Sequence, residues 1–157
     1  MVSLSDALTR EHREIDGGIE AFVADLDRDV VTPEPLLGAF EALRRHIYLE
    51  EEFLFPPIRQ AGLLMPVMVM IREHGALWQL MDALTELLDD HDPGEADDEL
   101  LTSCRALLDQ LDQHNSKEEP IIYPHADADL DEEATAHLLE FLETGRTPAG
   151  WVCEAVR

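Results

Sequence analysis

The residues best suited to chemistry are two histidines that each precede a glutamate by four positions: His46 with Glu50, and His114 with Glu118. In an α-helix, residues at this spacing lie on one face, roughly 6 Å apart along the axis. In both stretches that face is also the apolar one, so both glutamates are predicted to point into a core. Burying an unpaired carboxylate costs free energy, and two carboxylates that face each other also repel. Cations placed between them would offset both effects.

Both pairs belong to an internal repeat. Residues 46–56 and 114–124 each read His-x-x-x-Glu-Glu, followed at identical spacing by an apolar residue, an aromatic residue and a proline. Upstream, the tripeptide Arg-Glu-His occurs at residues 10–12 and again at 72–74. The chain therefore indicates two copies of one helical hairpin, each offering a histidine and then a histidine–glutamate pair.

Six inward side chains form the candidate metal site: His12, His46, Glu50, His74, His114 and Glu118. Taken alone, an inward histidine is more often a hydrogen-bonded core residue, and a His–Glu pair is often an ordinary contact on a helix surface. The combination on four helices favours a dinuclear site in a bundle core instead. Carboxylates can bridge two ions there, and imidazoles can complete each coordination sphere.

Several neighbouring residues have two interpretations. The extra glutamates of the motif are either solvated or in contact with a ligand: Glu51, Glu52 and Glu119. Asp16, one turn after His12, either hydrogen-bonds a ligand or lies on the surface. The aromatic residues near the motifs either line the site or, as we favour, pack in the core: Tyr48, Trp78 and Tyr123. Three further histidines are expected at the surface: His91, His125 and His137.

Apolar residues at three- and four-residue spacing predict four long helices and a short fifth one. The expected ranges are 5–28, 33–55, 66–91, 96–122 and 131–144, with Ser3 or Ser5 as the first cap. Prolines 56 and 57 are expected to break or kink the second helix, and Pro124 to end the fourth. Short connections favour an all-α, up-down-up-down four-helix bundle, and strands are not expected. We expect one domain over residues 1–145 and an unassigned tail over 146–157, with Trp151 as a candidate to dock it.

The composition excludes several function classes. The 35 acidic against 11 basic residues give a formal charge of −24, which argues against nucleic acid and against an anionic membrane surface. No apolar run is long enough for a bilayer span, so a cytoplasmic location is the default expectation. Cys104 and Cys153 have no metal or redox spacing, and Cys104 is interpreted as a small core residue.

These motifs resemble the haemerythrin-like HHE cation-binding domain family over about residues 4–124. The resemblance implies a carboxylate-bridged di-iron centre, with manganese or zinc as alternatives to iron. By analogy, Glu50 and Glu118 would be the bridges. One iron would take the histidines at positions 12 and 46, and the other those at positions 74 and 114.

The chain departs from the oxygen-carrying haemerythrins at two points. Those proteins have a further histidine where this chain has Trp78, and an aspartate five residues after the last histidine, whereas here Glu118 follows His114 at four. The sequence is more similar to symmetric variants with two histidines per iron. Such sites keep open or water-filled positions, which suits reaction with oxygen, peroxide or nitric oxide. Some related proteins repair iron centres under stress, and the resemblance to them is confined to the bundle.

Two hypotheses about function remain open. The first is a di-iron module that binds or senses O2, NO or iron itself. The alternative is a di-iron oxidoreductase that consumes peroxide or nitric oxide or contributes to iron-centre repair, with an unidentified reductant as partner. A ferritin-like enzyme is disfavoured because those sites use Glu-x-x-His pairs. A metal-free helical interaction protein would leave the inward carboxylates unexplained, and the oligomeric state is not predicted.

Overall fold

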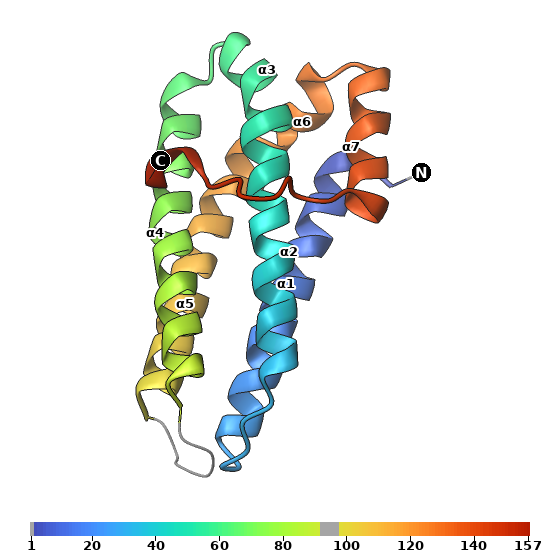
Figure 1. Ribbon diagram of the computed structural model, residues 1–157. Coiled ribbons are helices and arrows are strands. Elements are labelled where there is room, and N and C mark those ends of the chain that lie inside the picture. The colour runs from blue at the N-terminus through green and yellow to red at the C-terminus, as the bar shows by residue number, and fades with distance from the viewer. Residues whose placement is uncertain (1, 92–97) are drawn as a thin grey trace.

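The computed structural model describes residues 2–91 and 98–157 and forms a bundle of four long helices (Figure 1). These are α1 (Leu4–Leu26), α2 (Pro33–Leu49), α4 (Leu64–Asp89) and α5 (Asp98–Lys117), and consecutive members run in opposite directions. A shorter helix, α7 (Glu132–Thr144), follows near one end of the bundle. The described residues contain no strand. The prediction of an all-α bundle with a short fifth helix is therefore confirmed.

Local sequence explains where the helices begin. The Ser3 hydroxyl accepts a hydrogen bond from the Asp6 amide at the start of α1, and Asp131 caps α7 in the same way through the Ala134 amide. Helix α2 opens on Pro33, a residue favoured in the first turn because its missing N–H would have no helical partner. The predicted start of the fourth helix, at residue 96, lies outside the described residues.

The predicted end of the fourth helix at Pro124 was wrong, and at Pro56 and Pro57 the second helix continues and does not break. Each helix passes through one π-helical turn, η1 (Glu50–Leu54) or η2 (Glu118–Ile122), and continues as α3 (Phe55–Gln60) or α6 (Tyr123–Asp129). In each turn an aromatic N–H bonds to the carbonyl of the glutamate five residues earlier. The proline that follows then occupies the first turn of the new helical segment, where its lack of an N–H costs little.

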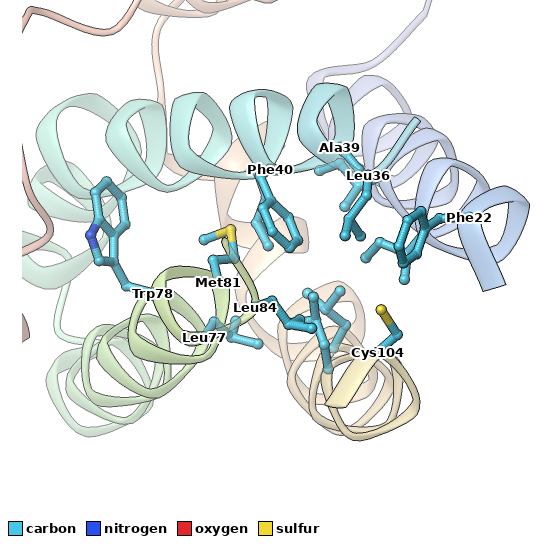
Figure 2. Packing of buried hydrophobic residues seen from close by; sticks show 14 of the residues in the cluster. Phe22, Leu36, Ala39, Phe40, Leu77, Trp78, Met81, Leu84 and Cys104 are labelled. Atoms are coloured by element: carbon cyan, nitrogen blue, oxygen red, sulfur yellow. The ribbon is translucent and has the colours of Figure 1, made fainter. Parts of the chain in front are cut away.

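The bundle core consists of two apolar clusters with a polar layer between them. One cluster fills the end near the α1–α2 and α4–α5 connections and is shown in Figure 2; it includes Phe22, Phe40, Met81, Cys104 and Leu107. The other fills the opposite end, around the π-helical turns; it includes Leu8, Leu54, Val67, Ile122 and Tyr123. Along each of the four helical stretches, with η1 and η2 counted as continuations of α2 and α5, the candidate ligands fall between residues of the two clusters. Apolar packing therefore encloses the polar layer from both ends.

The C-terminal tail crosses α2 and ends against α4 in a short 3-10 turn, η3 (Glu154–Val156) (Figure 1). The Trp151 ring packs on Tyr48 and Trp78, with ring centroids 5.1 and 5.7 Å away, and its Nε1 donates to Glu52 Oε1 at 3.0 Å. The expectation that Trp151 docks the tail is therefore confirmed. No helix in the described part of the chain is long and apolar enough to cross a bilayer.

Candidate metal centre

The six predicted ligand side chains meet in the polar layer, and all are buried, with at most 4% of each exposed. They form two groups that share both glutamates. The first half-site comprises His12, His46, Glu50 and Glu118, and the second comprises Glu50, His74, His114 and Glu118. Within each half-site, one donor atom from every residue lies within 4.8 Å of the others. The helical repeat thus brings together every residue that the sequence marked as a candidate ligand.

Each glutamate presents one oxygen to each half-site. Glu50 Oε2 lies 3.2 Å from His46 Nε2, and Glu50 Oε1 lies 3.1 Å from His74 Nε2. Glu118 Oε1 lies 3.1 Å from His12 Nε2, while its Oε2 lies 3.4 Å from His114 Nε2. This is the arrangement in which two carboxylates can bridge two cations.

The spacing and chemistry of these atoms fit metal ions. Two donors bound to one ion at about 2.1 Å, roughly at right angles or tetrahedrally, lie about 3.0–3.4 Å apart, and the contacts above span 3.1 to 3.4 Å. Three of the donor atoms are buried without a hydrogen-bond partner: Glu50 Oε1, His74 Nε2 and Glu118 Oε2. Buried polar atoms of this kind need a partner, and a cation would serve all three at once.

A ring of four outer carboxylates holds the imidazoles in orientation. His12 Nδ1 donates to Glu119 at 2.8 Å and His74 Nδ1 donates to Glu51 at 2.7 Å, so both of these bonds cross from one hairpin to the other. The other two bonds lie within a hairpin: His46 Nδ1 donates to Glu11 at 2.8 Å, and His114 Nδ1 donates to Glu73 at 2.9 Å. Since a carboxylate only accepts, every Nδ1 carries a proton and every Nε2 faces the site.

Glu11 and Glu73 were not predicted from the sequence as residues of the site. Both stand directly before a ligand histidine in the repeated Arg-Glu-His tripeptide, and that repetition was the available clue. Each is also paired with a base: Arg45 donates to Glu11 at 3.0 Å, and Lys117 donates to Glu73. The two interpretations of Glu51 and Glu119 are resolved in favour of contact with a ligand.

Other candidate residues lie outside the two half-sites. Trp78 belongs to the apolar cluster of Figure 2, and Tyr48 packs against Phe53. Asp16 Oδ1 is buried without a hydrogen-bond partner, so this atom gives no support for a bond to a ligand. Tyr123 differs from these residues because its hydroxyl reaches the first half-site. The hydroxyl lies 2.8 Å from His12 Nε2 and donates to Glu50 Oε2 at 2.8 Å.

The ionisation of these groups shows that the site favours positive charge. Burial alone lowers the pKa of His114, but Glu118 and Glu73 outweigh it and raise the pKa to about 10. The hydrogen bond from His114 is the largest of the effects that lower the pKa of Glu73 to about 2. Burial raises the pKa of Glu118, yet the imidazoles outweigh it and hold that pKa well below its ordinary value. A metal cation would supply this positive charge and displace the imidazole protons.

Comparison with known proteins identifies the family. A family model described as "Hemerythrin HHE cation binding domain" matches residues 3–126, which include all four long helices and both π-helical turns. No curated protein and no solved structure matches the chain. The family match agrees with the bundle and with the two His/Glu clusters that could hold a metal ion. The chain therefore belongs to the haemerythrin HHE cation-binding family.

Proposed function

We propose that this protein holds two iron ions in the two half-sites and binds a small molecule, such as O2, NO or peroxide, at that centre. The observation that carries the proposal is the sharing of Glu50 and Glu118, each with one oxygen directed to each half-site. A pair of ions bridged by both carboxylates uses all four oxygens, whereas a single ion would leave half of them unpaired and buried.

The donor set supports iron. Imidazole suits iron, zinc and copper, carboxylate suits harder cations such as manganese, and mixed His/carboxylate sites with open positions are typical of non-haem iron. Each half-site offers two imidazoles and two carboxylate oxygens, so about two positions of an octahedral ion remain for other ligands. In addition, six carboxylates converge on four imidazoles here, which favours ions of high charge.

The residues of the chain have separable tasks in this function. Bound iron would supply Lewis acidity and one-electron chemistry. The four histidines bind and orient it through Nε2, because the outer carboxylates fix each ring through Nδ1. The two apolar clusters exclude water from both ends of the site, which limits hydrolysis and the escape of reactive products.

The proposal is tested by loading the metal-free protein with ferrous iron under anaerobic conditions. We expect about two irons per chain, and we expect oxygen, nitric oxide or peroxide to change the visible spectrum of the loaded protein. Parallel loading with manganese and zinc tests the choice of metal. Failure to bind any of the three metals would contradict the proposal. A preference for zinc would contradict the redox part of the proposal, because zinc has no redox chemistry.

Catalytic turnover is the second candidate function. The second half-site offers four donors, which favours it, because an octahedral ion there would keep positions at which a small ligand could exchange. Steady consumption of peroxide or nitric oxide over many equivalents would support an oxidoreductase. A spectral change that stops after one equivalent per centre would support binding or sensing instead. The variant His114→Ala, which lacks one second half-site ligand, serves as the control for iron bound elsewhere.

A further inference from the structure

The two half-sites differ at one pair of equivalent positions in the repeat, where one hairpin has a tyrosine and the other a phenylalanine. Tyr123 directly follows η2 as Phe55 directly follows η1, each five residues after a bridging glutamate. The Tyr123 ring stacks on His12 with centroids 5.4 Å apart, and the Phe55 ring stacks on His74 with centroids 5.6 Å apart. The rings are therefore placed alike, but only the ring at the first half-site carries a hydroxyl group.

The π-helical turns explain why an aromatic side chain reaches the site at all. In an α-helix the residue stacked one turn beyond a glutamate would be four positions later, but a π turn joins positions five apart. The N–H groups of Phe55 and Tyr123 accordingly bond to the carbonyls of Glu50 and Glu118. Each aromatic ring crosses to the opposite half-site, so Tyr123 from the second hairpin meets the histidines of the first.

The Tyr123 hydroxyl contacts all four donors of the first half-site. Its distances are 2.8 Å to His12 Nε2, 2.9 Å to His46 Nε2, 2.8 Å to Glu50 Oε2 and 2.9 Å to Glu118 Oε1. A phenol has one proton and can donate one hydrogen bond. Once a cation has displaced the imidazole protons, both Nε2 atoms present lone pairs to the hydroxyl, as the two carboxylate oxygens do. One phenolic proton cannot satisfy all four atoms, whereas a cation beside the phenolic oxygen would.

The distances also leave room for that cation. Around the half-site, neighbouring donors lie 3.1 Å apart (Glu118 to His12 and His12 to His46) and 3.2 Å apart (His46 to Glu50). The phenolic oxygen is nearly equidistant from all four donors, so an ion bound by these donors would also lie within reach of the phenolic oxygen.

We propose that Tyr123 is a ligand of the iron in the first half-site, and that Phe55 leaves the iron of the second half-site with the position where a small molecule binds. On coordination the phenol loses its proton to solvent, and the oxygen lone pair forms the bond to iron without any change in oxidation state. The inference rests on the proposed di-iron function and makes the two irons chemically different.

The test compares four ferric proteins: the wild type, Tyr123→Phe, Phe55→Tyr and the double exchange of both residues. Iron content is measured first, then the visible phenolate-to-iron charge-transfer band and its resonance Raman spectrum. We expect the band in the wild type, its loss in Tyr123→Phe with iron retained, a stronger band in Phe55→Tyr and a restored band in the double exchange. Azide should bind to the wild type and fail to bind to Phe55→Tyr, where a second phenol occupies its position.

Tyr48 provides a matched control because it is the other tyrosine of the chain, packed between Phe53 and Trp151 away from the site. Tyr48→Phe should leave the band unchanged. Ring-deuterated tyrosine in the wild type should shift the Raman modes, which decides the question even where Tyr123→Phe does not fold. A wild type with about two irons but no phenolate band would overturn ligation by Tyr123 while the proposed function stands. A wild type that binds no iron would overturn the proposed function, and ligation with it.

Discussion

The two helical hairpins, α1 with α2 and α4 with α5, match residue for residue at the ligands and differ at one aromatic ring. Each supplies two histidines and one bridging glutamate, and each half-site takes both of its histidines from one hairpin. Each half-site also needs the opposite hairpin. That hairpin supplies one of the two bridging oxygens, the aromatic ring stacked on a histidine, and one of the two outer carboxylates. Each half-site is therefore complete only when both hairpins pack together, although each hairpin supplies half of the histidines and half of the bridging glutamates.

The largest expected effect comes from removing a shared carboxylate. Glu118→Ala and Glu50→Ala should each lower iron content well below two equivalents, because both half-sites lose an oxygen. Each should also destabilise the iron-free protein by about 3–5 kcal/mol, since the facing imidazolium is left buried without its partner. Metal analysis and chemical denaturation measure the two effects, and exposed Glu41→Ala serves as the control. Unchanged iron content in Glu118→Ala would remove that residue from the ligand set.

A smaller and more symmetric effect is expected from the outer carboxylates that cross between hairpins. Glu51→Gln and Glu119→Gln keep the size of the side chain but weaken the hydrogen bond to His74 or to His12. Each should lower the affinity of one half-site for iron by about 10–100-fold, as partners of metal-binding histidines commonly do. Competition with a chelator measures this loss. If only one of the two substitutions lowered iron affinity, the outer carboxylates of the two hairpins would not be equivalent.

The stability of the iron-free protein should depend on pH in a way that iron removes. The pKa of His114 is raised to about 10, so its stabilising contribution is complete below about 6.5 and is lost as the pH rises towards 10. The pKa of Glu73 is lowered to about 2, so its contribution is present above about 4.5 and is lost as the pH falls towards 2. Thermal unfolding should therefore give the highest Tm of the iron-free protein near pH 5–6. Bound iron replaces the imidazole protons, so the decline on the alkaline side should disappear. The same decline in the loaded protein would contradict this account of His114.

The smallest effect should come from the tail and should fall on one half-site. The Glu154 amide donates to Glu51 Oε1 at 2.9 Å, while Glu51 Oε2 accepts from His74, so the tail steadies an outer carboxylate of the second half-site. Trp151→Ala should loosen the tail, lower stability by about 1–3 kcal/mol and reduce iron affinity at the second half-site by less than Glu51→Gln does. Equal weakening of both half-sites in the chelator assay would show that the tail acts through global stability instead.

Much of this site could be predicted from the sequence because its residues break the apolar pattern of their helices. An inward glutamate such as Glu50 has no explanation within a metal-free core, and its repetition at Glu118 made the interpretation specific. The bundle followed from the same periodicity, since the ligands occupy core positions on four helices.

The remaining features depend on backbone geometry that the pattern does not encode. Pro56 predicts a break or a kink and Pro124 predicts a helix end, but a π turn before each lets the helix continue, and this turn also directs the aromatic ring inwards. Of the two interpretations of Tyr123, core packing was therefore favoured, although its hydroxyl reaches the first half-site. Glu11 lies one residue from His12 but bonds to His46 on the next helix, a pairing that becomes visible only when the helices are packed.

The central claim is that both half-sites belong to one dinuclear centre, and low-temperature Mössbauer spectroscopy of the diferric protein, with EPR on the same sample, tests it most directly. Two ferric ions bridged by Glu50 and Glu118 should be spin-coupled, so the sample should be silent in EPR and show a diamagnetic ground state with about two irons per chain. Two unequal quadrupole doublets would further agree with the difference between Tyr123 and Phe55. Uncoupled high-spin ferric iron, or a single iron per chain, would contradict the account.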